Sequence, residues 1–343
     1  MHEGKVYRGI GVNFYGAFNG YFINGNDEFK AIFTLLAAHG IEFCRINIGL
    51  FWPVDYDKWS KNQQQYFKCL DEVVQMAEQQ NIGIICSFFW YMQGISDFYD
   101  EPGNAWGDLK SRTRKYMAQY TEQIVSRYME SPAIWGYEFG NEINLACDLP
   151  NAAEHRGAVI PELGTRLTRD SRDDLTADIA QPLLEEFAKI VKKTDKYNRI
   201  VTSGCAEPRP SQYNQRMHGS WQTDTRDQMA QAMNWFNPSP MDCASIHLYD
   251  LLDRFLPTGQ ICYANLIKAY MEEANKQGKA LFVGEFHGLD RLCEDIIDAI
   301  VTNRTPISAV WAIGTVEYSL STDPARQNAV LKYIEDANKL LKN

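Results

Sequence analysis

The sequence predicts a (β/α)8 barrel, and three observations lead to this fold class. Eight short apolar segments alternate along the chain with eight longer amphipathic segments. The apolar segments are continuous runs, which is typical of parallel strands buried on both faces. Long connections follow the predicted strands, as in barrels that carry their chemistry at the C-terminal ends of the strands. An open doubly wound sheet is the alternative, but no Gly-x-Gly-x-x-Gly or P-loop pattern follows the first predicted strand.

Length and composition fit one domain spanning residues 1–343 with long strand-to-helix loops. Of the 343 residues, 45% are hydrophobic and 23% are charged, so we expect a large core. The net charge is -10 without any basic run, which argues against nucleic acid or an anionic membrane as a partner. The longest apolar stretch, residues 82–92, is too short to span a bilayer. We expect a monomer, secreted or periplasmic if a signal peptide has been removed and otherwise cytoplasmic.

The first half of the chain supplies four predicted strands and four predicted helices. The strands cover residues 7–13, 42–48, 82–89 and 134–141. The helices cover residues 27–39, 63–80, 109–129 and 178–194. Each helix is predicted from apolar residues that recur at helical spacing; in the first one they end at Gly40, a stop signal.

The second half repeats the alternation. Strands are predicted over residues 199–205, 242–248, 280–285 and 307–313. Helices are predicted over residues 225–236, 263–277, 289–303 and 324–341. Half of the 8 cysteines fall inside predicted strands, namely Cys44, Cys86, Cys205 and Cys243. Because buried cysteine behaves as a small hydrophobe and the chain has no Cys-x-x-Cys pair, we expect reduced thiols without a disulfide framework or a metal.

Two glutamates stand at the exits of predicted strands. Glu142 follows Gly-Asn at the end of the fourth strand, and Glu285 follows Val-Gly at the end of the seventh. In a closed barrel these exits face each other across the mouth. Cleavage of a glycosidic bond uses two carboxyl groups, one that protonates the leaving oxygen and one that attacks the anomeric carbon or activates water. The alternative is that both glutamates form ion pairs that cap the barrel.

At these exits the chain resembles glycoside hydrolase clan A, most closely family 5, the cellulases and mannanases. The resemblance spans nearly the whole sequence, with one motif on each matched strand. It implies that Glu142 is the acid/base of a retaining, double-displacement mechanism and that Glu285 is its nucleophile. It also implies that Asn141, in the Asn-Glu pair, bonds the sugar 2-hydroxyl.

Five further residues match positions of the same family. Arg45, in Cys-Arg-Ile-Asn, matches the arginine of strand two that holds the nucleophile ionised. His247 and Tyr249 match a His-x-Tyr motif after strand six, and we expect them to bond near Glu142 and Glu285 respectively. Trp311 matches the tryptophan of strand eight that forms the floor under the reacting sugar, and Asn13 matches a strand-one position near the substrate.

The predicted loops on the active face are rich in aromatic residues that could stack on sugars. We expect an elongated cleft lined by Trp90, Tyr91, Trp106 and Trp221, with Trp52 after the second strand. Family 5 cellulases carry a histidine after strand three, where this chain has Ser-Phe-Phe-Trp-Tyr. Trp90 or Tyr91 is therefore expected to line the subsite in its place.

The environment of each carboxyl group leads to an expectation about its pKa. Arg45 stays charged and is expected to lower the pKa of the nucleophile. Glu142, beside a neutral asparagine and aromatic residues, is expected to have the raised pKa that suits an acid. Three other acids are present: Glu138 inside strand four is expected to be structural, and Glu207 and Glu317 at strand exits are expected to contact sugar hydroxyls.

The predicted function is hydrolysis of β-linked glucan or mannan, as polysaccharide or oligosaccharide, with no metal or cofactor. An exo-acting β-glycosidase of the same clan and a carbohydrate-binding barrel without catalysis are the alternatives. A metal-dependent hydrolase is disfavoured because the 6 histidines show no ligand spacing. The sequence does not assign a role to the long, charged loop over residues 143–177.

Overall fold

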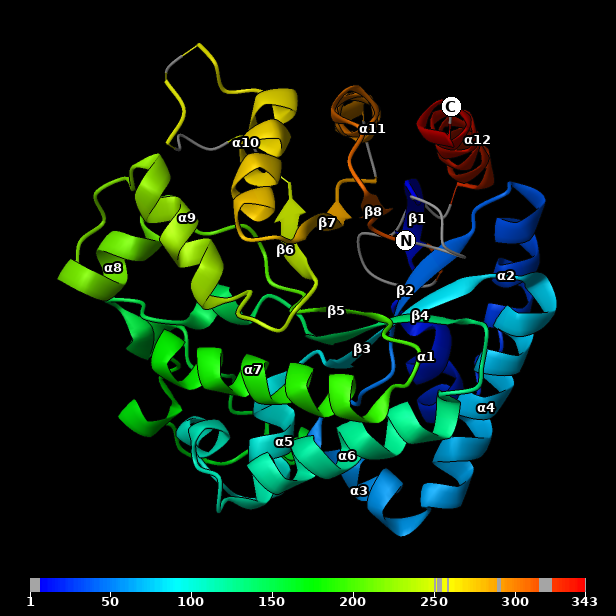
Figure 1. Cartoon of the computed structure of the whole chain (residues 1–343). Helices are drawn as coiled ribbons and strands as arrows, with labels where there is room; N and C mark the ends of the chain where they lie inside the picture. Colours follow the sequence, from blue (N-terminus) through cyan, green and yellow to red (C-terminus); the bar gives the residue numbers. More distant parts are fainter. Residues whose placement is uncertain are drawn as a thin grey trace.

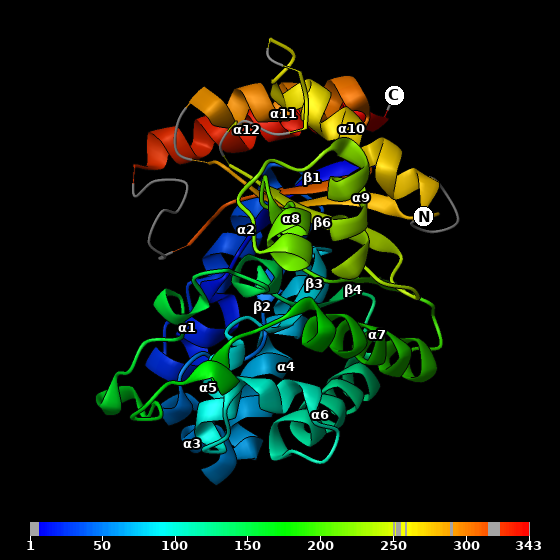
Figure 2. The same ribbon diagram turned by 90° about the vertical axis from the view of Figure 1, so that its left-hand side faces the viewer.

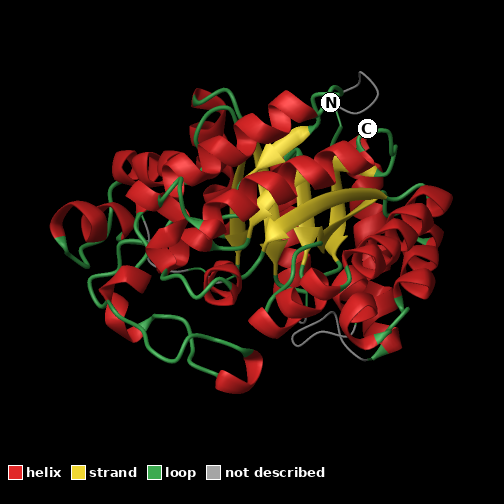
Figure 3. Cartoon of the chain, turned by 90° about the horizontal axis from the view of Figure 1, so that it is seen from below, coloured by secondary structure: helices red, strands yellow, loops and turns green. Residues whose placement is uncertain are grey.

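The computed structural model describes residues 7–249, 251, 255–257, 259–288, 291–314 and 323–342. Eight parallel strands form a nearly closed barrel, and helices surround it (Figures 1 and 3). The strands are β1 (Gly9–Asn13), β2 (Phe43–Asn47), β3 (Gly83–Phe89), β4 (Ile134–Gly140), β5 (Ile200–Thr202), β6 (Cys243–Leu248), β7 (Ala280–Phe286) and β8 (Ile307–Val310). The predicted (β/α)8 fold class is therefore confirmed.

The eight predicted helices are present within the described residues. They are α2 (Phe29–Ala38), α4 (Gln63–Gln80), α6 (Arg112–Tyr128), α7 (Ala177–Thr194), α9 (Arg226–Trp235), α10 (Tyr263–Lys276), α11 (Arg291–Asn303) and α12 (Pro324–Lys342). Four helices that were not predicted lie in connections that follow strands: α1 (Gly16–Asn24), α3 (Pro53–Lys61), α5 (Met92–Phe98) and α8 (Gln212–His218). The elaborated face of the barrel is thus the C-terminal face. None of the described helices is long and apolar enough to cross a membrane.

Capping residues decide where several helices begin. The Ser111 side chain accepts a hydrogen bond from the backbone N–H of Arg114 at 2.9 Å, so α6 begins at Arg112 rather than at the predicted residue 109. Thr225 and Gln228 form a reciprocal capping box at the start of α9. Each such cap satisfies N–H groups that the first helical turn leaves without partners.

The last helix, α12, is hydrogen-bonded to the first strand, β1, through a side chain. The Asn338 side chain in α12 accepts a hydrogen bond from the N–H of Ile10 at 2.7 Å and donates one to the Ile10 carbonyl oxygen at 2.9 Å. Strand β1 also pairs with β8, with Gly11 opposite Ala309. Helices α10, α11 and α12 lie side by side along this part of the barrel (Figures 1 and 2). The two ends of the chain therefore close the barrel together.

One seam of the barrel is closed by side chains, because β5 and β6 do not pair as a regular ladder. The Asn237 side-chain oxygen accepts from Ser203 Oγ at 2.7 Å and from the N–H of Ser245 at 2.9 Å. Asp242 donates its backbone N–H to the Val201 carbonyl at 3.0 Å and accepts from the Val201 N–H at 2.8 Å. A polar seam of this kind keeps both strand edges hydrogen-bonded.

The barrel interior changes from apolar to polar toward the active face. Its lower layer is the small cluster of Phe43, Ile85, Cys243, Phe282 and Ala309. Two residues further along come Arg45, Ser87 and Ser245, with Gly284 in β7 and Trp311 directly after β8. Since side chains two apart share one face of a strand, the polar side chains of Arg45, Ser87 and Ser245 occupy the layer beneath the mouth.

We predict that Asn237→Ala weakens the seam. The change leaves the Ser245 N–H and the Ser203 hydroxyl without their buried acceptor, which should lower the free energy of unfolding by about 3 kcal/mol. Urea denaturation measures it. The control Asn234→Ala alters an exposed side chain in α9, three residues before Asn237. Equal stability of the two variants would contradict the role of Asn237.

Candidate active site

A buried arginine organises the centre of the barrel mouth. Arg45 Nε donates to Glu138 Oε1 at 2.6 Å, and Nη1 donates to Glu285 Oε1 at 2.6 Å and to Asn13 Oδ1 at 2.9 Å. Its Nη2 donates to Asn141 Oδ1 at 2.9 Å. Arg45 has no exposed surface. A guanidinium in such a place requires partners for all its N–H groups, and these partners come from β1, β4 and β7 and from the β4 exit.

Glu285, the residue expected to be the nucleophile, is held by two donors. One carboxylate oxygen accepts from Arg45, and the other accepts from the Tyr249 hydroxyl at 2.8 Å. The expected Tyr249 contact is therefore present. Burial and the nearby negative charge of Glu285 raise the pKa of Tyr249 well above its ordinary value, so Tyr249 remains a donor across the physiological range.

Glu142 reaches the mouth through an unusual backbone conformation. Its φ is 52°, in the left-handed region, and its N–H donates to the Gly204 carbonyl at 2.8 Å. Gly204 also has positive φ, and a Cβ there would lie 1.9 Å from the Gly140 carbonyl oxygen. Only glycine allows the β5 exit to pass so close to the β4 exit. This turn leaves 30% of the Glu142 side chain exposed.

Glu142 and His247 form a coupled pair. His247 Nδ1 lies 2.9 Å from Glu142 Oε1 and 3.6 Å from Glu285 Oε2. Burial opposes ionisation of Glu142, but the hydrogen bond and positive charge of His247 outweigh it and lower the pKa of Glu142. Burial likewise opposes the charge on His247, but the charge of Glu285 and the bond to Glu142 raise the pKa of His247. The expectation of a raised Glu142 pKa is wrong for the free protein, because His247 supplies the neighbouring charge.

Glu138, in β4, was expected to have a structural role, and its surroundings agree with this expectation. It is completely buried and bound to Arg45 through one oxygen. Burial raises the pKa of Glu138, while the charge of Arg45 opposes this shift. Glu138 therefore balances part of the arginine charge without reaching the mouth.

Three residues could in principle hold a metal ion. Glu142, His247 and Glu285 each present a ligand atom, and these atoms lie within 4.8 Å of one another. Both oxygens of Glu285 already accept hydrogen bonds, and one lies 2.6 Å from the Arg45 guanidinium. A cation next to that fixed positive charge would be disfavoured electrostatically.

Aromatic rings cover the arginine and form one wall of the mouth. The Arg45 guanidinium carbon lies 4.3 Å from the centroid of the Trp90 ring, a cation–π contact. Trp90 also lies 5.8 Å from Trp311 and 5.0 Å from Tyr15, centroid to centroid. Tyr15, which follows β1, was not singled out from the sequence; an aromatic residue at a strand exit was the available signal. Trp90 and Trp311 are both partly exposed, as a sugar-stacking role requires.

A second aromatic group lies beside this wall. Tyr91 stacks on Phe51 with ring centroids 4.4 Å apart and planes 8° apart. Trp52 meets Tyr91 at 5.3 Å, edge to face. The rings of Trp52 and Tyr91 are partly exposed, so this group also offers aromatic surface on the active face.

The structure bears on three sequence expectations about substrate contacts. Asn13 has no exposed surface, and its Nδ2 donates to the Gly284 carbonyl at 2.9 Å, so it positions Arg45 rather than facing substrate. Trp106 is only 1% exposed and donates from Nε1 to the Met92 carbonyl, so most of its ring is packed in the core, although it is also one of the residues that line the cavity at Glu142. Trp221 is 59% exposed and is not among the residues that line the cavity at Glu142, so its contact with substrate stays a prediction.

Two further acids, Glu207 and Glu317, were expected to contact sugar hydroxyls. Glu207 follows β5 and is half-buried, with its backbone carbonyl accepting from Asn144 Nδ2 at 3.4 Å. Glu317 lies outside the described residues.

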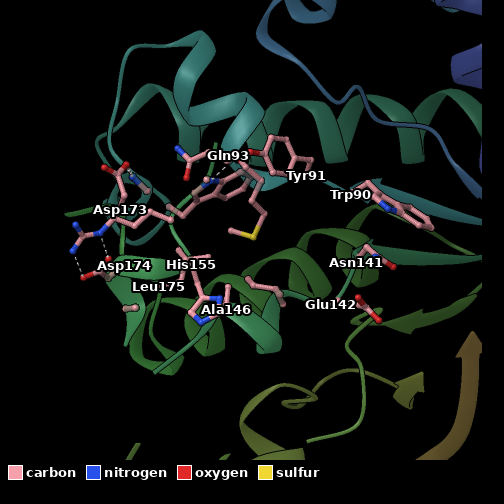
Figure 4. A pocket seen from close by; sticks show the side chains of 17 residues that line it. Trp90, Tyr91, Gln93, Asn141, Glu142, Ala146, His155, Asp173, Asp174 and Leu175 are labelled. Carbon is pink, nitrogen blue, oxygen red and sulfur yellow. Dashed lines mark hydrogen bonds and ion pairs between the residues drawn. The ribbon is translucent and has the colours of Figure 1, made fainter. Parts of the chain in front are cut away.

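A cavity of about 170 Å³ extends from Glu142 into the loops after β3 and β4. Figure 4 shows Trp90, Asn141 and Glu142 at one end, with Asp173 and Asp174 at the other. The β4–α7 loop, residues 141–176, supplies the far end and includes the short 3-10 helices η2 (Ile143–Ala146), η3 (Ala152–Glu154), η4 (Pro161–Leu163) and η5 (Ser171–Asp173). The charge of this loop was evident from the sequence, but of its cavity residues only Asn141 and Glu142 were predicted to belong to the site.

This arrangement defines a class of protein. A parallel barrel with two carboxylates at the exits of β4 and β7, around a buried arginine, is the architecture of barrel glycoside hydrolases. The family model for cellulase (glycosyl hydrolase family 5) matches residues 8–312. The chain therefore belongs to glycosyl hydrolase family 5 and is a glycoside hydrolase.

Solved structures of similar fold include three enzymes of low sequence identity. The endo-beta-1,4-mannanase from Thermotoga petrophila is 15% identical, with a TM-score of 0.65 covering 98% of this chain and 77% of its own. A family 5 mannosidase from Rhizomucor miehei is 13% identical, with a TM-score of 0.64 covering 100% and 95%. Endoglucanase Cel5A from Thermotoga maritima is 16% identical, with a TM-score of 0.57 covering 95% and 96%. None of the curated proteins matches the sequence.

We predict that the stability contributed by the Glu142–His247 pair depends on pH. His247 has a folded pKa above its ordinary 6.5, and Glu142 one below its ordinary 4.5. Stability gained from a raised histidine pKa is complete below the unfolded value and is lost as pH rises through the folded value. Stability gained from a lowered carboxyl pKa is fully present when the pH lies above the pKa of that carboxyl group in the unfolded chain, and it is lost as pH falls through the folded pKa.

Glu142→Gln should therefore destabilise the protein most between pH 4.5 and 6.5, by about 2 kcal/mol. The deficit should shrink as pH rises above that range. Urea denaturation across pH measures it, with Glu162→Gln, an exposed change in the same loop, as the control. A deficit that stays constant or grows with pH would contradict the charged pair.

Proposed function

We propose that this protein is a retaining β-glycoside hydrolase that cleaves β-linked mannan or glucan chains. Glu285 is the nucleophile and Glu142 is the acid/base. The observation that carries the proposal is the closeness of the two carboxylates, because one oxygen of Glu142 and one of Glu285 lie within 4.8 Å of each other. Retaining enzymes place their carboxyl groups about 5–5.5 Å apart, whereas inverting enzymes leave roughly 6.5–9.5 Å for a water molecule.

The first step forms a covalent glycosyl-enzyme. A carboxylate oxygen of Glu285 bonds to the anomeric carbon while the glycosidic C–O bond breaks, and the leaving oxygen takes a proton from Glu142. The hydrogen bonds from Arg45 and Tyr249 aim the Glu285 carboxylate and favour its ionised form. Both donors hold it without a change of geometry during attack.

The proton for the leaving oxygen is shared by Glu142 and His247. In a strongly coupled pair the protons belong to the pair rather than to either group. The pair binds one proton between the lowered pKa of Glu142 and the raised pKa of His247. The 2.9 Å hydrogen bond allows this proton to move from His247 to Glu142 and from Glu142 to the leaving oxygen, which leaves neutral His247 beside the Glu142 carboxylate. Glu142 can therefore act as the acid although its own pKa is lowered, because His247 supplies the proton.

The second step returns the nucleophile. Glu142, now a carboxylate, removes a proton from a water molecule, and the resulting hydroxide oxygen bonds to the anomeric carbon as the Glu285 ester bond breaks. Water enters from the face that the leaving group vacated, so the anomeric configuration is retained overall.

Binding of the reacting sugar falls to groups around this pair. The Asn141 side-chain oxygen is used by Arg45, so its NH2 group is the one offered to a substrate hydroxyl. Trp311 supplies ring surface for the apolar face of this sugar, and Trp90, next to Trp311, lies between the reacting sugar and the cavity at Glu142. Mannan and glucan are the substrates to test first, because similar structures include mannanases, a mannosidase and an endoglucanase.

Replacement of the two glutamates tests the mechanism. We expect Glu285→Gln to abolish turnover, since no covalent intermediate can form. Glu142→Ala should still be glycosylated by a substrate with an activated leaving group and then stall, and azide should restore turnover and give a β-glycosyl azide. A 2-deoxy-2-fluoro glycoside should label Glu285 in a peptide digest. Label on another carboxylate, or a first product of inverted configuration by NMR, would overturn the assignment.

A polysaccharide panel tests the substrate. We expect reducing sugar from β-mannan or from β-glucans to exceed that from xylan, and we expect the activity to persist with EDTA. Cellulose, mixed-linkage glucan and laminarin separate the glucan linkages, and the fall in viscosity per bond broken separates endo from exo action. Activity on xylan alone, or a loss with EDTA that metal ions reverse, would contradict the proposal.

A further inference from the structure

The cavity that begins at Glu142 lies on one side of the catalytic pair. Asn141 and Glu142 line it, but Glu285, Tyr249 and Trp311 are not among its described lining residues. In a double displacement the acid contacts the leaving oxygen, and the nucleophile attacks from the opposite face of the sugar. A cavity lined by the acid and not by the nucleophile is therefore on the leaving-group side.

The walls of this cavity combine ring surface with a polar end. Trp90, Tyr91 and Met92 come from the β3 exit, and Ile143 and Leu175 from the β4–α7 loop. At the far end an ion pair closes the row of side chains (Figure 4). A pyranose has apolar C–H faces and a rim of hydroxyls, so it matches a site with aromatic walls and a few polar groups.

The far-end ion pair consists of Arg156 and Asp174. Arg156 Nε and Nη2 donate to the two oxygens of Asp174 at 2.6 and 3.0 Å. About a fifth of each side chain remains exposed, 21% for Arg156 and 24% for Asp174. The bidentate pair uses one edge of the guanidinium, so Arg156 Nη1 and the remaining carboxylate lone pairs are available to substrate hydroxyls.

Buried ion pairs hold the two loops together around the cavity. Arg169 in the β4–α7 loop donates to both oxygens of Asp97 in α5, each at 2.5 Å. Asp173 accepts from the Gly103 N–H at 3.0 Å and from Arg166 Nη1 at 2.8 Å. These contacts link the β4–α7 loop to the connection between β3 and α6, so the cavity is built before substrate binds. A preformed site loses less ordering entropy on binding.

We infer that this cavity is the leaving-group site and that Arg156 and Asp174 determine its specificity. It binds a short saccharide leaving group, whose rings lie along Trp90 and Tyr91 and whose distal hydroxyls bond to the ion pair. The inference rests on the proposed function, because it needs Glu142 as the acid. It assigns the β4–α7 loop to the choice of substrate.

Two substrates that share a glycone test this inference. A 2,4-dinitrophenyl β-glycoside has a leaving group without the hydroxyls that would bond to the ion pair, whereas the leaving group of a β-1,4-linked oligosaccharide of the same sugar carries them. We expect Arg156→Ala and Asp174→Asn to lower kcat/KM for the oligosaccharide about tenfold or more, through both kcat and KM. They should change the dinitrophenyl glycoside less than about twofold.

The matched control is Arg172→Ala, which removes an arginine of the same loop that pairs with Asp170 at 2.7 Å on the surface. It should leave both substrates unchanged. Arg156→Lys, which keeps the charge but not the bidentate geometry, should fall between wild type and Arg156→Ala on the oligosaccharide. Graded loss would show that the variants remain folded.

The outcomes separate this inference from the proposed function. If the wild-type protein hydrolyses neither substrate, the proposed function fails. If wild type is active and Arg156→Ala affects both substrates equally or neither, only the leaving-group site is overturned. Efficient release of long reducing-end fragments from polymer by the wild type would likewise contradict a short leaving group.

Discussion

The buried charge of Arg45 is the interaction on which the rest of the site depends. A guanidinium without exposed surface loses its hydration, and only nearby carboxylates and carbonyls can compensate. Here Glu138 and Glu285 supply two charge-assisted hydrogen bonds of 2.6 Å. Because the partners come from β1, β4 and β7, this compensation is complete only when the barrel is nearly closed and in register. The same buried charge therefore favours closure of the barrel and fixes the orientation of the Glu285 carboxylate.

The sequence predicted those features that the position of a residue along a strand determines. Strand exits converge in a barrel, so Glu142, Glu285, His247 and Tyr249 could be expected to meet. Depth below the mouth and the path of loops cannot be obtained in this way. Asn13 ends its strand one layer below the mouth and is used by Arg45. Trp106 lies in a loop by sequence, but that loop folds back and packs the indole against Phe89 and Phe139.

The β4–α7 loop shows why loops escape sequence reasoning. It contains short 3-10 turns without apolar periodicity, so neither helix nor strand patterns describe it. Its shape depends on arginine–aspartate pairs whose members are distant in sequence, such as Arg169 and Asp97, which is completely buried in its side chain. Many charged residues in a loop suggest a solvated surface, and only the three-dimensional structure shows which of them are paired and which line a cavity.

The charges of the mouth also account for the change of Glu142 from acid to base that the proposed mechanism requires. In the free protein the negative charge of Glu285 is the leading influence that raises the pKa of His247, and His247 in turn lowers that of Glu142. In the proposed mechanism Glu285 becomes a neutral ester, so its negative charge no longer raises the pKa of His247. The proton that the leaving oxygen has received is the one that His247 held. The intermediate therefore favours neutral His247 beside ionised Glu142, which is the state that can accept a proton from water. The loss of one negative charge at Glu285 is matched by the loss of one proton at the pair, so each step leaves the pair in the protonation state that the next step requires.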